Sequence, residues 1–171
     1  MTGGRQGIGR GIVEAYRREG AAVTTCGRGP RPDGLSDSVI WYPLGVTDAD
    51  AVEELAHATD GTEILVNNAG VQAEKTVSDS TDADWNAVIG TNCRCVFNMC
   101  RAFIPQMSEG GSIINIGSIS GQVADPAMAR LTRLSTSIRP SGKPRSDYTK
   151  TFPVRSPTAF MPQTGARRSA S

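Results

Sequence analysis

Apolar side chains recur at helical spacing in three segments of the chain. The pattern predicts a helix from Gly9 to Glu19, where Gly20 follows as a stop signal. Alternating acidic and apolar positions predict an amphipathic surface helix from Asp48 to Ala58. Residues Thr81 to Met107 carry apolar positions throughout and predict one long helix or two.

Short apolar runs lie between these segments and predict strands. The predicted strands are Ala22 to Cys26, Val39 to Tyr42, Ile64 to Val66 and Gly111 to Ile116. The Gly, Pro and Asp content of residues 27 to 37 predicts a loop between the first two strands. Because strands and helices alternate, we expect an α/β fold with a Rossmann-like, doubly wound parallel sheet that is covered on both faces.

The pattern ends near Ala129. Residues 1 to 129 hold 9 Lys and Arg against 16 Asp and Glu, a charge of −7, whereas residues 130 to 171 hold 9 against 1, a charge of +8. The later residues are rich in Arg, Ser, Thr and Pro and show no sustained periodicity. We therefore predict one partial α/β domain over residues 1 to 129 and a disordered basic tail over residues 130 to 171.

Several functional classes are disfavoured by composition. The four cysteines and the single histidine match no common zinc spacing, so we expect no metal site and reduced thiols in a cytoplasmic protein. No apolar run approaches the ~20 residues of a membrane span. The basic tail has scattered aromatic residues and no recognisable nucleic-acid module, which argues against nucleic-acid binding.

A glycine-rich turn precedes the first predicted helix. Residues 2 to 9 read T-G-G-R-Q-G-I-G, in which Gly3 allows a tight turn, Gly7 lets the backbone approach a pyrophosphate and Gly9 lets the helix pack closely. The free N–H groups and partial positive charge at the helix start favour phosphate. The turn alone is equally compatible with a purely structural role.

Three further motifs follow in a meaningful order. Asn67 to Gly70 reads N-N-A-G, the helix from Trp85 to Pro105 contains Asn92, and the strand beginning at Ile113 reads I-I-N-I-G-S-I-S-G and contains Ser118. With the glycine turn, these motifs resemble those of the short-chain dehydrogenases/reductases over roughly residues 2 to 129. The resemblance implies an NAD(P)-dependent oxidoreductase that transfers a hydride between a nicotinamide and a small carbonyl or alcohol substrate.

The resemblance also implies roles for particular residues. Ser118 would hydrogen-bond the substrate oxygen, or else only cap the strand end; Asn92 would hold a water of a proton relay, or else be a polar residue satisfied within its helix. The N-N-A-G asparagines would be mainly scaffold, with backbone contact to the cofactor. The implied cofactor-binding residues are Gly3, Arg5, Gly7, Ile8, Gly9, Arg28, Asn68, Ala69 and Gly70.

The expected cofactor is NADP(H) rather than NAD(H). Residues 23 to 28 contain no acid to accept from a ribose 2′-hydroxyl, and Arg28 follows the strand directly, so Arg28, with Arg5, would pair with a 2′-phosphate. The alternative for Arg28 is a solvated loop residue. Gly45 stands where the family usually has an aspartate that binds adenine. We expect Asp48 to cap the following helix rather than to take over the role of that aspartate.

Two parts of the family pattern are missing. The catalytic Tyr-x3-Lys would begin 13 residues after Ser118, where this chain has Leu131 and Ser135, and no apolar first strand precedes Thr2. A frame change near Thr132 and a misassigned start codon are the explanations we infer. Because a general acid contributes about 10²–10⁴-fold, we expect a catalytically impaired enzyme or, alternatively, a non-catalytic NADP(H)-binding module. A homo-oligomer is expected only if the rest of the family fold is present.

Overall fold

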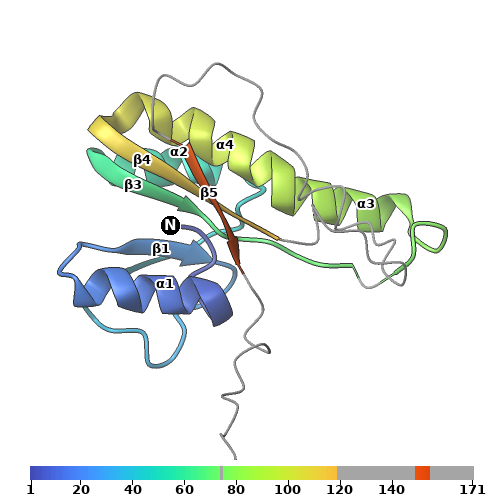
Figure 1. The fold of residues 1–171 in the computed structure, drawn as a ribbon, viewed down its shortest axis with the longest axis horizontal. Helices are drawn as coiled ribbons and strands as arrows, with labels where there is room; N and C mark the ends of the chain where they lie inside the picture. The colour runs from blue at the N-terminus through green and yellow to red at the C-terminus, as the bar shows by residue number, and fades with distance from the viewer. Residues whose placement is uncertain (74, 119–148, 155–171) are drawn as a thin grey trace, which may run out of the picture.

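The computed structural model describes residues 1–73, 75–118 and 149–154. Strands and helices alternate along most of it, as predicted, but the first two strands follow each other with no helix between them (Figure 1). The elements in chain order are α1 (Gly7–Arg18), β1 (Thr24–Gly27), β2 (Ile40–Pro43), α2 (Ala49–Ala58), β3 (Thr62–Asn67), α3 (Asp82–Ile89), the π-helical η1 (Gly90–Arg94), α4 (Cys95–Phe103), the 3₁₀ turn η2 (Ile104–Gln106), β4 (Met107–Ser118) and β5 (Thr149–Val154).

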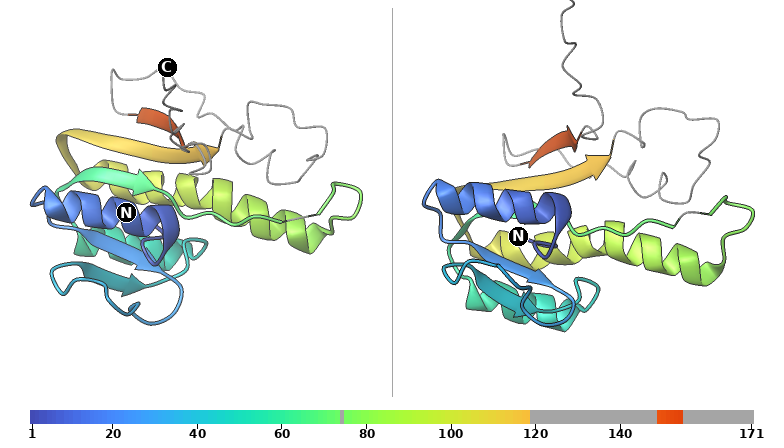
Figure 2. Two further views of the ribbon diagram at one scale, coloured as in Figure 1. Left: turned by 60° about the horizontal axis from the view of Figure 1, so that its bottom comes forward. Right: turned by 90° about the horizontal axis from the view of Figure 1, so that it is seen from below.

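The strands form two hydrogen-bonded groups in which every pairing is parallel. One group has the order β1-β2 and the other has the order β3-β4-β5. Figure 2 shows α1 on one side of the strands, and α2 and α4 lie against each other on the opposite side. This arrangement confirms the prediction of an α/β fold with helices on both faces.

The core is divided between these two sides. The larger cluster joins α2 and α4 to the strands, with members such as Val52, Leu65 and Met99 that are almost completely buried. The smaller cluster packs Val13 of α1 against Leu35 and Val39 from the segment between β1 and β2. The predicted loop at residues 27 to 37 therefore contributes a buried side chain, although it contains no helix or strand beyond Gly27.

The two strand groups are joined by the first three residues. The Thr2 amide donates to the Val66 carbonyl at 2.9 Å, and the Gly3 amide donates to the Cys26 carbonyl at 3.0 Å. Thr2 also forms an isolated parallel bridge with Cys26. Residues 1 to 3 therefore lie between β1 and β3 and link the two strand groups through backbone hydrogen bonds.

The long helical segment changes its hydrogen-bond pattern once, although its backbone stays helical. Thr81 caps α3 in a reciprocal capping box with Asp84. The five-residue π-helical stretch η1 then separates α3 from α4, which resolves the prediction of one helix or two in favour of two. None of the described helices is long and apolar enough to cross a membrane.

Strand β5 corrects the prediction of a tail without secondary structure. Thr149–Val154 pairs in parallel with β4, from Ile113 opposite Thr149 to Ser118 opposite Val154. The sequence is compatible with a strand, since Thr149, Thr151, Phe152 and Val154 are residue types that favour strands and a proline is tolerated at a sheet edge, but the strand forms by pairing with the distant β4. The correction concerns these six residues, because the other residues predicted as tail lie outside the described ones.

Candidate functional site

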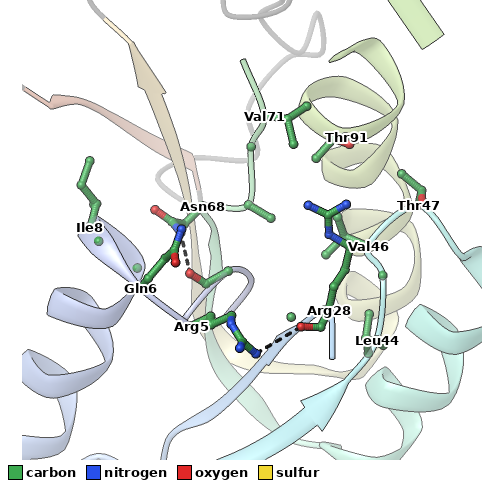
Figure 3. Close-up of a pocket in the computed structure, with 17 residues that line it drawn as sticks. Arg5, Gln6, Ile8, Arg28, Leu44, Val46, Thr47, Asn68, Val71 and Thr91 are labelled. Carbon is green, nitrogen blue, oxygen red and sulfur yellow. Dashed lines mark hydrogen bonds between the residues drawn. The ribbon is translucent and has the colours of Figure 1, made fainter. Parts of the chain in front are cut away.

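A cavity of about 600 Å³ opens at the carboxyl ends of β1, β2 and β3 (Figure 3). Its wall is formed by the glycine turn, by the residues that follow each of these strands and by Thr91. In open parallel sheets, ligands bind outside the carboxyl ends of the strands. All nine predicted cofactor-binding residues line it: Gly3, Arg5, Gly7, Ile8, Gly9, Arg28, Asn68, Ala69 and Gly70.

The glycine turn requires glycine for different reasons at its three positions. Gly3 has φ of +72°, and a Cβ there would lie 2.9 Å from Nδ2 of Asn68. A Cβ on Gly9 would collide with the Gly3 carbonyl oxygen and lie 2.5 Å from the same Asn68 nitrogen. Gly7 has φ of +56° but meets no atom within 4 Å, so its backbone remains open to a ligand.

The start of α1 is suited to an anion. Its N-cap residue Gln6 makes no side-chain capping hydrogen bond, and the first turn contains no acidic residue. The N–H groups of Gly7 to Gly9 thus have no capping side chain, and the positive end of the helix dipole lies at the cavity wall. The cavity lining contains two arginines and no Asp or Glu. This wall can hold a phosphate group.

Thr2 fixes the turn to the loop after β3. Its side chain is fully buried, and its hydroxyl oxygen accepts from the amides of Asn68 at 3.0 Å and Ala69 at 2.9 Å. In return, Nδ2 of Asn68 donates to the carbonyls of Thr2 at 3.1 Å and Gly3 at 3.3 Å. The Asn68 side chain is therefore scaffold, as expected. The sequence interpretation missed Thr2, although it stands at the first position of the glycine motif.

Asn67 also has the expected structural role. Its Nδ2 donates to Oδ1 of Asn115 at 2.9 Å, which joins β3 to β4 through side chains as well as backbone. The same nitrogen lies 3.7 Å from Sγ of Cys100 on α4. Asn67 thus connects two strands and the helix that covers them.

The two predicted phosphate-binding arginines are arranged differently from one another. Nη1 of Arg5 donates to the carbonyl of Pro30 at 2.8 Å and lies 3.4 Å from the carbonyl of Arg28. The Arg28 side chain is exposed, and Figure 3 shows it extending away from Arg5, on the side of Val46 and Thr91. Arg28 is therefore the arginine that reaches into the cavity, whereas Arg5 contacts backbone.

The two predicted catalytic residues do not line the cavity. Asn92 lies in η1, where its Oδ1 accepts from the Val71 amide at 2.8 Å and its Nδ2 donates to the Val71 carbonyl at 2.9 Å. Its side chain therefore binds the backbone of the loop after β3. Ser118 is exposed at the carboxyl end of β4. Leu131 and Ser135 lie outside the described residues.

The loop after β2 forms the remaining wall. Gly45 lines the cavity, and a Cβ placed on it would meet no atom within 4 Å. The aspartate that the family usually has at this position would therefore fit here. Asp48 accepts from the Ala51 amide at 3.1 Å as the N-cap of α2, which confirms the predicted capping role.

Two ionisable groups outside the cavity have strongly shifted pKa values. Hydrogen bonds from Lys75 and from the backbone and hydroxyl of Thr81 hold the pKa of the Asp84 carboxyl well below its usual range. Burial raises the pKa of the Cys95 thiol to about 12, so this cysteine is a packing residue at pH 7. All four cysteines are free thiols.

Comparisons with known proteins agree with this geometry. The family model described as short chain dehydrogenase matches residues 1–130. The chain is 31% identical over 140 residues to 3-oxoacyl-[acyl-carrier-protein] reductase FabG of Thermotoga maritima, covering 74% of this chain and 57% of that protein. It is 35% identical over 143 residues to D-beta-hydroxybutyrate dehydrogenase of Rhizobium meliloti, covering 74% and 55%. The chain thus spans somewhat more than half the length of these relatives.

Solved structures give the same result. Serine dehydrogenase from Escherichia coli superposes with a TM-score of 0.72 at 30% identity, covering 80% of this chain and 68% of that chain. The closed form of serine dehydrogenase complexed with NADP+ superposes with a TM-score of 0.72 at 29% identity, covering 80% and 59%. The matched family model, the shared fold and the glycine turn at the carboxyl edge of the strands together establish that this chain belongs to the short-chain dehydrogenase family.

Proposed function

We propose that the cavity binds NADP(H) and that the chain carries the nucleotide-binding half of an oxidoreductase acting on a small carbonyl or alcohol substrate in the cytoplasm. The observation that carries the proposal is the convergence of all nine predicted binding residues on one cavity, at a helix start with no capping side chain. The FabG and D-beta-hydroxybutyrate dehydrogenase relatives support the class of reaction.

The residues present fit a dinucleotide phosphate. The amides of Gly7 to Gly9 would hold the pyrophosphate at the positive end of α1, because Gly7 leaves the space beside its backbone open. Arg28 would pair with the ribose 2′-phosphate, which is the group that separates NADP(H) from NAD(H). When bound, the nicotinamide would supply or accept the hydride.

The reaction would take place at the carboxyl edge of β4. We assign Ser118 to hydrogen-bond the substrate oxygen there, since it ends the strand that runs beside β3. Asn92 would act through the loop after β3, because both of its amide atoms bind the Val71 backbone. Its part is to hold the segment from Asn68 to Val71, which follows β3 and lines the cavity.

A second candidate is a module that binds NADP(H) without turnover. The sequence favours it at one point: Leu131 and Ser135 stand where the family has its acid/base tyrosine and lysine. Without a positioned proton donor, the rate would fall by about 10²–10⁴-fold. A truncated or frame-shifted gene product would have this property.

Two measurements on the purified chain separate these candidates. NADP+ should raise its unfolding temperature more than NAD+ does at equal concentration, because ligand that binds only the folded state stabilises it. NADPH oxidation with a panel of ketones, dicarbonyls and quinones then tests turnover. Thermal protection with turnover supports the enzyme, protection without turnover supports the module, and a folded chain that neither nucleotide protects would refute both.

A further inference from the structure

Arg5 holds the turn that carries Arg28. It belongs to the glycine turn, and its Nη1 donates to the Pro30 carbonyl at 2.8 Å, with the Arg28 carbonyl at 3.4 Å from the same nitrogen. Figure 3 shows the Arg5 guanidinium directed at the Arg28 backbone oxygen. One arginine of the cavity thus binds the main chain of the other.

The held turn has little other support. Gly29 has φ of +79°, and a Cβ placed on it would lie 3.8 Å from Nη1 of Arg5, so the arginine packs directly on this residue. On the other side, Nε1 of Trp41 lies 3.4 Å from the Gly29 carbonyl. Between Gly27 and Ile40 the structure has no helix or strand, so the position of this turn depends on such side-chain contacts.

Holding the turn affects how Arg28 can bind. A residue on an unfixed loop must lose backbone freedom when it engages a ligand, and that loss weakens binding. A turn that is already fixed before the ligand binds does not lose this backbone freedom. The resulting gain in affinity is confined to ligands that Arg28 contacts. A contact that fixes Arg28 therefore changes the preference between two nucleotides that differ only at the ribose 2′-position.

We propose that Arg5 is a positioning residue for nucleotide selection: it fixes the Arg28 to Pro30 turn so that Arg28 is presented to a ribose 2′-phosphate. The inference rests on the proposed binding of NADP(H). It differs from the sequence-based expectation that Arg5 itself binds the phosphate, because Nη1 of Arg5 is engaged by backbone carbonyls. The two roles give different results when Arg5 and Arg28 are changed together.

A double-mutant cycle tests the assignment. Dissociation constants for NADP+ and NAD+ are measured by calorimetry for the full chain and for Arg5→Ala, Arg28→Ala and the double variant. The readout is the ratio of the two constants, which a general loss of stability does not alter. We expect Arg28→Ala to reduce the preference for NADP+ by about 10- to 100-fold and Arg5→Ala by about 3- to 10-fold. In the double variant, Arg5→Ala should not change this ratio beyond the effect of Arg28→Ala alone.

Matched variants complete the design. Arg18→Ala removes one positive charge from the far end of α1, where Arg18 donates to the Glu14 carbonyl, and should leave the ratio unchanged. Arg5→Gln provides a second cycle if Arg5→Ala does not fold. Independent, multiplicative effects of the two changes would make Arg5 a direct phosphate ligand and overturn the inference. If the unchanged chain binds neither nucleotide while folded, the proposed function itself fails.

Discussion

Thr2 in the glycine turn and Ser118 at the carboxyl end of β4 differ in burial, because Thr2 is fully buried and Ser118 is exposed. In the turn, Thr2 and Asn68 form four hydrogen bonds with backbone groups, and Gly3 and Gly9 lie too close to their neighbours for a side chain to fit without a shift. At the other edge, Ser118 is exposed at the end of its strand. If the cavity binds the nucleotide and Ser118 acts in turnover, as proposed, this difference in burial predicts that substitutions at the Thr2 junction affect stability and nucleotide binding more than substitutions at Ser118 do.

The largest expected effect comes from the junction at Thr2. Thr2→Val keeps the shape but leaves the partly buried amides of Asn68 and Ala69 without this acceptor, which should lower the free energy of unfolding by about 2–4 kcal/mol. Denaturant titration measures it. Thr2→Ser keeps the hydroxyl and should cost much less. Equal losses in both variants would mean that the hydroxyl is not what holds the junction.

The next effect is at Gly9. Gly9→Ala forces its new methyl group against the Gly3 carbonyl and the Asn68 amide, which should cost about 1–3 kcal/mol of stability and also weaken NADP+ binding. Gly11→Ala is the matched control, because a Cβ there meets no atom within 4 Å and alanine favours a helix. Thermal unfolding measures the stability of both variants, and calorimetry measures their NADP+ binding. The melting temperature should fall for Gly9→Ala and rise for Gly11→Ala, and a fall of equal size in both would contradict the close packing of Gly9.

A gain of binding is expected at Gly45. Gly45→Asp places a carboxylate in open space on the cavity wall, where one additional hydrogen bond to the adenine would tighten NADP+ binding about fivefold. Gly45→Ala adds the Cβ without the acceptor and should leave the dissociation constant nearly unchanged. Weaker binding of the aspartate variant would show that this wall does not face the adenine.

A smaller, pH-dependent effect is expected at Lys75. Its ammonium lies 2.8 Å from Oδ2 of Asp84. Because the folded-state pKa of Asp84 is lowered, its contribution to stability is present above its unfolded pKa, about 3.9, and is lost as the pH falls below that value. Lys75→Met should lower the melting temperature slightly at pH 7 and by less at pH 2. If Lys75→Met lowered the melting temperature equally at pH 7 and pH 2, the ion pair between Lys75 and Asp84 would not be the cause.

The smallest effect is expected at the edge of β4. Ser118→Ala should change the free energy of unfolding by no more than about 0.5 kcal/mol, since exposed positions tolerate substitution. Its NADP+ dissociation constant should stay within about twofold of the unchanged chain. A large loss of nucleotide affinity would show that the two regions are coupled and remove the contrast drawn above.

Much of the fold could be predicted because it is encoded locally. The helical spacing around Val13, the cap at Asp48 and the apolar run at Ile64 to Val66 each specify an element without reference to the rest of the chain. Strand β5 could not be predicted in the same way, since its pairing with β4 joins positions separated by more than thirty residues and depends on tertiary contact.

The candidate site shows the same division. Glycine positions follow from backbone geometry, so Gly3, Gly7 and Gly9 could be assigned from their spacing. The partners of long polar side chains could not be assigned, because they depend on how loops fold together. The sequence did not indicate that Arg5 donates to the Pro30 carbonyl or that Asn92 binds the Val71 backbone, and the expected phosphate contact of Arg5 stays a prediction.

The central claim is that the amides at the start of α1 hold the phosphates of a dinucleotide. A titration of the ¹⁵N-labelled chain with NADP+, followed by amide resonances, tests it most directly. We predict saturable shifts of the Gly7, Ile8 and Gly9 amides, with unchanged resonances for Ala56 in the core of α2. A folded chain whose Gly7 to Gly9 amides do not respond at millimolar NADP+ would contradict the account.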